Sequence, residues 1–232
     1  MKTIISAENQ ILDAAAVHIK KTLLVRKNAV LALAGGRSVR GLYERLLRMY
    51  DCGEISFAGV RALALTELLD VPENMSCRKV ILDNFLCKTD ISTANVHFPD
   101  PEHPEHYEEL IAECGGIDIA VLGIGENAHI GYNEPATPFA SVTHVQKLTD
   151  ATRHQLEKQY PYAEKLPEKA VTMGIKTITQ ARDIIVLAMG EDKSQAVHKM
   201  LYGRNDSVAP AAFLQIPLNV NVYLDEAASS GL

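Results

Sequence analysis

The run Ile117–Leu122 is the feature that most constrains the fold, because all but one of its side chains are apolar. Gly115 and Gly116 introduce the run, and Gly123 ends it. A short apolar run between turn residues, rich in β-branched side chains, is typical of a strand buried on both faces in the centre of a parallel sheet. We therefore expect the chain to fold around such a sheet.

Strand-like runs and amphipathic helix-like segments alternate along the rest of the chain. Strands are expected at 29–34, 60–65, 142–148, 183–189 and 219–224, and helices at 8–25, 39–50, 76–86, 104–114, 191–201 and from Thr149 onward. This alternation predicts an α/β fold with a mostly parallel sheet and helices on both faces. The 232 residues, 47% of them hydrophobic, contain no linker or repeat, so one Rossmann-like domain over residues 1–232 is expected.

The composition of the chain argues against several kinds of ligand and partner. A formal net charge of −6 argues against a nucleic-acid-binding surface, although a local basic pocket for phosphate is compatible with it. The four cysteines lack metal-ligand spacing, so we expect reduced thiols and no metal site. No apolar stretch is long enough for a signal peptide or a membrane span, which predicts a cytoplasmic protein without a membrane partner. Homo-oligomerisation stays open, since no helix face marks a subunit interface.

Titratable and amide side chains follow the central strand directly. Gly123 and Gly125 let the backbone turn tightly beside a ligand, and open α/β sheets bind ligands at the carboxyl edge of their strands. His129 follows, with Asn127 and Glu134 near enough in sequence to reach its ring. The pattern predicts a histidine acid–base catalyst oriented by an amide and a carboxylate. A Gly-x-Gly and a histidine alone would also fit a plain surface loop.

A second candidate site is the segment Ala34–Ser38, which joins an expected strand to an expected helix. Unpaired N–H groups and the positive end of the helix dipole favour a phosphate there. Gly35 and Gly36 permit close approach, Ser38 can cap the helix or donate its hydroxyl, and Arg37 adds a permanent charge. An ordinary strand-to-helix turn with a capping serine fits the same residues.

The stretch from Gly123 to Pro135 resembles the glucosamine-6-phosphate deaminase/isomerase family, whose pattern is close to Gly-Ile-Gly-x-Asn/Asp-Gly/Ala-His-Ile-x-Phe/Tyr-Asn-Glu-Pro. The related 6-phosphogluconolactonases share the Gly-x-Gly and the histidine but lack the Asn-Glu-Pro. Segments 41–43 and 167–175 extend the resemblance, whereas 34–38 is nearer to the lactonase pattern. The resemblance implies a phosphorylated sugar as substrate and no cofactor.

The resemblance also implies roles for individual residues. His129, oriented by Glu134 and Asn127, would assist opening of the sugar ring. Proton movement between C2 and C1 would then give a ketohexose phosphate and ammonia. The substrate phosphate would be held by the glycine-rich segment and two lysines, namely Gly35, Gly36, Arg37, Ser38, Lys193 and Lys158.

The chief departure from the family lies after the strand expected at 60–65. Deaminases and lactonases place Asp-Glu there, and in the deaminases the aspartate removes the C2 proton, but this chain has Thr66 and Glu67. A threonine hydroxyl is far too weak a base at neutral pH. Glu67 is the candidate substitute, although adjacent residues of a strand face opposite sides.

Several functions are therefore compatible with the sequence. The segment 133–135 favours an amino-sugar-phosphate deaminase. A lactonase would use His129 to activate water, and a galactosamine-6-phosphate isomerase would suit an altered loop from Thr66 to Leu68. A non-catalytic phosphosugar sensor would keep the phosphate contacts without the base.

Overall fold

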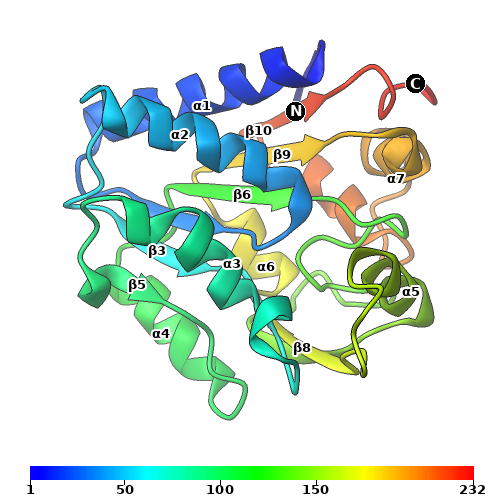
Figure 1. Cartoon of the computed structure of the whole chain (residues 1–232). Coiled ribbons are helices and arrows are strands. Elements are labelled where there is room, and N and C mark those ends of the chain that lie inside the picture. The colour runs from blue at the N-terminus through cyan, green and yellow to red at the C-terminus, as the bar shows by residue number, and fades with distance from the viewer.

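A seven-stranded sheet, with the strand order β1-β10-β9-β6-β2-β3-β5, forms the centre of the protein (Figure 1). The computed structural model describes residues 1–232, and every neighbouring pair in this sheet is parallel. The strands are Lys2–Ile5 (β1), Val30–Leu33 (β2), Arg61–Ala64 (β3), Val96–His97 (β5), Ile119–Gly123 (β6), Asp183–Ala188 (β9) and Val220–Leu224 (β10). The expected α/β fold class is confirmed.

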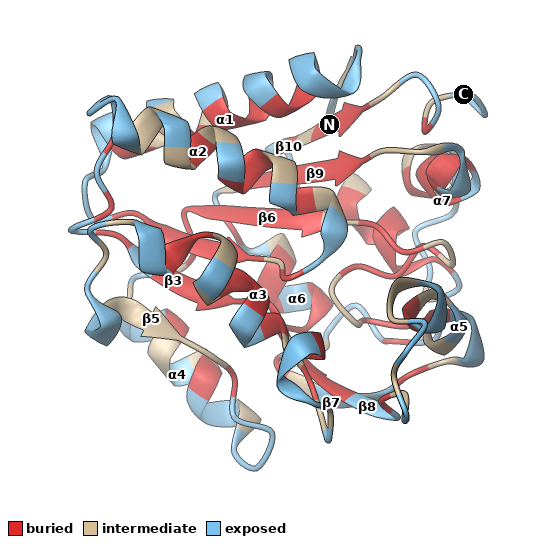
Figure 2. Cartoon of the chain, viewed as in Figure 1, coloured by how far each residue is buried: buried red, intermediate tan, exposed pale blue.

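Side-chain alternation along the strands explains why helices cover both faces of the sheet. In β2, Leu31 and Leu33 join the core on one face, whereas Val30 and Ala32 join the core on the other. The first face is covered by α1 (Glu8–Val25), α2 (Arg40–Asp51) and α3 (Cys77–Asn84), and the second by α4 (Pro104–Glu113), α6 (Ile175–Thr179) and α7 (Ser194–Tyr202). Figure 2 shows buried strands between helices that are exposed on their outer sides. None of the helices is both long and apolar enough to span a membrane.

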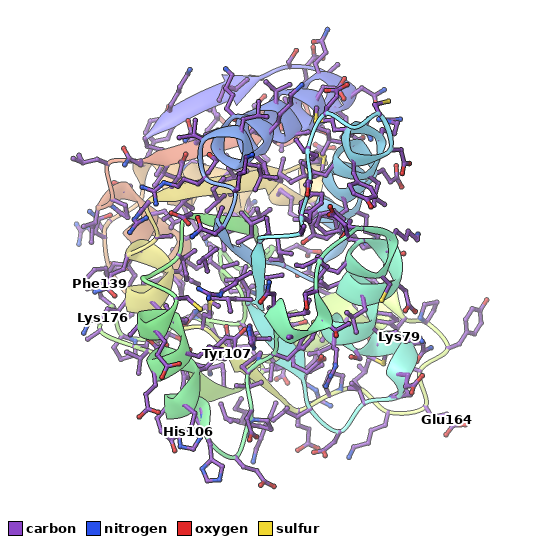
Figure 3. The ribbon with its side chains drawn as sticks, turned by 90° about the vertical axis from the view of Figure 1, so that its left-hand side faces the viewer. Lys79, His106, Tyr107, Phe139, Glu164 and Lys176 are labelled. Atoms are coloured by element: carbon purple, nitrogen blue, oxygen red, sulfur yellow. The ribbon has the colours of Figure 1, made fainter.

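Helix α4 is fixed to the sheet by one buried tyrosine. The hydroxyl of Tyr107 lies 3.0 Å from the carbonyl oxygens of both Ala64 and His97, so it can donate to either strand end. His106, the preceding residue, is exposed and points away from the sheet in Figure 3. This tyrosine therefore ties α4 to the end of β5 and to the end of β3, which lies two residues before Thr66 in the chain.

A separate three-stranded antiparallel sheet, in the order β4-β8-β7, is not expected from the sequence. Its strands are Thr66–Leu68 (β4), Lys169–Thr172 (β8) and His144–Lys147 (β7). The strand expected at 142–148 exists, but it belongs to this sheet. Such short strands are specified by their partners rather than by their own pattern. Helix α5 (Asp150–Gln159) packs Leu156 into a small core under this sheet.

The order of the parallel strands brings four loops to one place. The chain runs from β2 outward to β3 and β5, then returns to the other side of β2 and continues through β6 to β9. At such a reversal the loops that leave two neighbouring strands diverge, which opens a crevice at the carboxyl edge of the sheet. In Figure 1 the arrowheads of β6 and β9 point toward α5 and α7, on the side where these loops gather.

Candidate active site

A cavity opens at this crevice and collects most of the residues expected to act there. Its lining includes Gly35, Gly36, Arg37, Ser38, Thr66, His129 and Lys193. These residues follow four different strands, β2, β3, β6 and β9, which are neighbours in the sheet. Helix α5 closes one side through Thr152, Gln155 and Gln159.

His129 is held by a chain of hydrogen bonds that begins at Glu134. The Glu134 carboxylate, 1% exposed, accepts from Nδ2 of Asn127 at 2.8 Å. This contact orients the amide so that Oδ1 of Asn127 lies 2.7 Å from Nδ1 of His129. A carbonyl oxygen can only accept, so Nδ1 carries the proton and Nε2 keeps its lone pair. Nε2 has no protein partner and is available to a ligand in the cavity.

Burial keeps His129 in its neutral form. Its pKa is lowered from the ordinary value of 6.5, chiefly because the ring is desolvated. The Glu134 carboxylate opposes this shift and the Lys193 ammonium adds to it. The carboxylate acts partly through the intervening amide, since Oε2 of Glu134 lies 3.8 Å from Nδ1, beyond hydrogen-bond range. The imidazole is therefore a base at neutral pH.

Two of the glycines that line the cavity are also required by close packing inside the protein. A Cβ on Gly125 would collide with Cε1 of His129, so any side chain there would displace the imidazole. A Cβ on Gly35 would lie 2.9 Å from Cα of Cys77, at the start of α3. A Cβ on Gly36, by contrast, would have no neighbouring atom within 4 Å, so Gly36 leaves its side of the cavity open.

Lys193 gives the cavity a buried positive charge. It lies on the 3₁₀ turn Glu191–Lys193 after β9 and is 5% exposed. Its Nζ makes no hydrogen bond, and Oδ2 of Asp192 lies 3.4 Å away. A buried ammonium without hydrogen bonds is costly unless an anion completes the site. Arg37 and Ser38 line the same cavity, which is therefore suited to a phosphate.

The assignment of Lys158 to the phosphate site is not supported by the structure. Lys158 is exposed on α5 and does not line the cavity. The face of α5 that does so carries Thr152, Gln155 and Gln159, spaced by three or four residues. Lys158 precedes Gln159 by one position, which turns its side chain by roughly 100° around the helix.

Glu67 is likewise turned away from the cavity, which rules against its role as a substitute base. Its Oε1 accepts from the backbone N–H groups of Leu68 and Cys77, at 2.9 and 2.8 Å. Its Oε2 accepts from the N–H of Arg78 and the hydroxyl of Ser76, at 2.7 and 3.0 Å. Both oxygens are thus engaged in capping the start of α3, where a negative charge also meets the positive end of the helix dipole.

Two residues that line the cavity beside Thr66 are not expected there from the sequence. Cys77 lies next to it, with Sγ 3.6 Å from Oγ1 of Thr66, and Tyr132 lies beside His129 with ring centroids 5.9 Å apart. Burial, followed by the Glu67 charge, raises the pKa of Cys77 to about 12, and burial also raises that of Tyr132. Both groups therefore stay neutral. Cys77 comes from α3, and no local sequence pattern connects it to the loop after β6.

Comparisons with known proteins give a family match over most of the chain. Residues 6–222 match the family described as glucosamine-6-phosphate isomerases/6-phosphogluconolactonase. A glucosamine-6-phosphate deaminase of Pseudoalteromonas translucida is 38% identical over 225 residues, covering 93% of this chain and 84% of the relative. One from Thermoanaerobacter sp. is 36% identical over 239 residues, covering 99% and 94%.

Solved structures give the same result. A monomeric glucosamine-6-phosphate deaminase superposes with a TM-score of 0.95 at 33% identity, with 100% of both chains covered. The 6-phosphogluconolactonase of Trypanosoma brucei has a TM-score of 0.78 at 21% identity, covering 100% of this chain and 98% of the other, and it shares the fold.

Proposed function

Because the chain belongs to the family of glucosamine-6-phosphate isomerases and 6-phosphogluconolactonases, we propose that it is an enzyme that converts glucosamine-6-phosphate, or a close amino-sugar phosphate, to a ketohexose phosphate and ammonia. The observation that carries this proposal is one cavity with a free basic nitrogen on His129 and a buried ammonium on Lys193. The first can move protons on a sugar, and the second can hold its phosphate. The relatives that share 36–38% identity are named deaminases, which favours this chemistry over lactone hydrolysis.

His129 performs the first step in this proposal. Nε2 accepts the proton of the C1 hydroxyl and returns it to the ring oxygen, which opens the sugar ring. The imidazole gains a positive charge between these transfers. Asn127 keeps its bond to Nδ1 throughout, and the buried Glu134 carboxylate stabilises the charged ring.

The second step moves a proton from C2 to C1 of the open sugar. Loss of the C2 proton gives an enolamine, and protonation at C1 gives an imine at C2. Water then replaces the nitrogen, which leaves as ammonia. Since Thr66 carries no base and Glu67 is engaged elsewhere, Nε2 of His129 is the base that faces the cavity. We infer that this step is slow and limits turnover.

One assay separates the candidate functions. The protein is incubated with glucosamine-6-phosphate, galactosamine-6-phosphate or 6-phosphogluconolactone, while ammonia, ketohexose phosphate and lactone loss are measured. Ammonia and ketohexose phosphate in equal amounts support the proposal. Lactone loss without ammonia would replace it with a hydrolase, and binding without any product would replace it with a sensor.

Replacing Lys193 by methionine should weaken binding of phosphorylated sugars by about 1.5–3 kcal/mol, because a charge-assisted hydrogen bond to phosphate is lost. Calorimetric titration with glucose-6-phosphate measures the change. Lys158→Met is the matched control, since Lys158 is exposed and outside the cavity, and it should bind like the parent protein. Equal weakening by both variants would contradict a specific phosphate site at Lys193.

Glu67→Gln should lower the free energy of unfolding by about 0.5–2 kcal/mol, as expected for an impaired helix cap. A glutamine can keep one accepting oxygen but places an NH₂ group against a backbone donor of α3. Urea unfolding measures the loss, and turnover per folded molecule is measured alongside it. If turnover collapsed while stability stayed unchanged, Glu67 would be a catalytic base after all.

A reducing compartment suits the protein's cysteines. All four are free, and Cys52 and Cys87 are exposed. Unpaired exposed thiols are typical of proteins kept reduced, whereas oxidising compartments favour disulfides. We therefore propose that the reaction takes place in the cytoplasm.

A further inference from the structure

The cavity contains no carboxylate. Its ionisable lining residues come from five segments, and they are Arg37, Cys77, His129, Tyr132, Tyr160 and Lys193. The two permanent charges among them are both positive. The thiol and the phenols have raised pKa values because they are buried, and His129 is neutral because its pKa is lowered. The surface offered to a ligand is thus neutral or cationic throughout.

Three carboxylates near the cavity contact protein groups, and a fourth, Glu126, whose charge raises the pKa of His129, does not line the cavity. Glu134 lies behind His129 and accepts from Asn127 and Thr149. Glu67 has both oxygens engaged at the start of α3. Asp192 lies 3.4 Å from the ammonium of Lys193. None of these carboxylates lines the cavity, so a cation that entered it would meet none of their oxygens on the cavity wall.

The negative charge of a bound sugar phosphate is balanced by the two cationic residues of the cavity, without any further cation. A phosphate monoester carries roughly −1.5 to −2 at neutral pH. Arg37 and Lys193 supply two opposing charges at the cavity. An ammonium on the same sugar would add a positive charge that nothing in the lining offsets. In a partly desolvated site, an uncompensated charge of this kind is costly, so the ligand loses its proton instead.

We propose that this cavity binds sugar phosphates whose C2 substituent is uncharged, so that an amino sugar enters as its free amine. The inference deepens the proposed function and rests on it, because it concerns the form of the substrate in the same site. It follows from the composition of the whole lining, and it holds wherever in the cavity the amine lies.

Binding of two sugars that differ only at C2 tests the proposal. Dissociation constants of glucose-6-phosphate and glucosamine-6-phosphate are measured calorimetrically from pH 6 to pH 9. Taking the amine pKa as about 8, as for an α-amino group, the amino sugar should bind about 100-fold more weakly than glucose-6-phosphate at about pH 6. The ratio of the two dissociation constants should fall about tenfold for each pH unit, up to about pH 8. Phosphate and His129 titrate alike with both sugars, so their effects cancel in the ratio.

Two variants at Thr66 provide a matched control. Thr66→Asp places a carboxylate in the cavity and should remove most of the difference in affinity between the two sugars at pH 6. Thr66→Asn should preserve this difference. A ratio that does not change with pH, or tighter binding of the amino sugar at pH 6 in the parent protein, would overturn the proposal.

The same titrations distinguish this proposal from the proposed function. If both sugars bind with the expected ratio but no ammonia is formed, the deaminase function fails and the inference stands. If ammonia is formed and the charged amine binds well, the inference fails and the function stands. If neither sugar binds, both are refuted.

Discussion

Replacing His129 by alanine is expected to lower turnover of the amino-sugar phosphate by about 10²–10⁴-fold, since it removes the base that opens the ring. Affinity for the substrate should remain largely intact, because the proposed phosphate contacts are made by Lys193 and Arg37 and not by His129. Steady-state turnover and the dissociation constant of glucose-6-phosphate are measured on the same preparation. Turnover close to that of the parent protein would remove His129 from its role.

The pH dependence of the parent protein provides a second readout of His129. Protonation of Nε2 abolishes the base, so activity should fall as the pH drops through the pKa of this imidazole. That pKa lies below the ordinary 6.5, because the ring is buried. The acid limb of the turnover profile should therefore lie below that value, and activity should persist through neutral pH. Asn127→Leu removes the acceptor for Nδ1 of His129. This variant should change the pH at which turnover falls, while leaving phosphate binding unchanged.

Thr66→Asp is expected to raise deaminase turnover by about 10²-fold, if the C2 proton transfer limits the parent protein. Thr66 is 5% exposed and lines the cavity. A carboxylate at this position would be partly desolvated, and desolvation raises the pKa of an acid toward the range useful for a base. The measurement is ammonia release from glucosamine-6-phosphate at saturating substrate.

Thr66→Asn is the control for this gain, because it has the shape of aspartate without its basicity. It should leave turnover at the level of the parent protein. A folded Thr66→Asp variant that binds the sugar phosphate but shows no gain would reject the lost-base explanation. A different substrate, or a loop after β3 that has diverged more broadly, would then account for the threonine.

The parts of the fold that could be predicted from the sequence have strong local patterns. Helix α1 has the expected bounds, Glu8–Val25, because its apolar residues recur along one helical face. Strand β6 is recognisable because it is buried on both faces. The three strands of the small sheet have three or four residues each, and their pairing depends on contacts between distant segments. No local period reveals such contacts.

The residues of the candidate site also differ in whether sequence spacing could reveal them. His129, Asn127 and Glu134 lie within one loop, so their association could be expected from sequence spacing, and the structure brings them together. Cys77 reaches the cavity through the packing of α3 against Gly35, which sequence spacing cannot show. The resemblance assigns Lys158 by its position alone, and the orientation of α5 turns this side chain outward.

The pairing of β1 with β10 has a consequence for how the protein is made. Strand β1 lies at the edge of the sheet and pairs only with β10, the strand farthest from it along the chain. Strand β1 therefore cannot dock until β10 has left the ribosome. Strands β2, β3, β6 and β9, which position the cavity, do not pair with β1 and can assemble earlier. Exchange of β1 amide hydrogens with solvent can thus occur by local fraying, without opening the strands that hold the cavity.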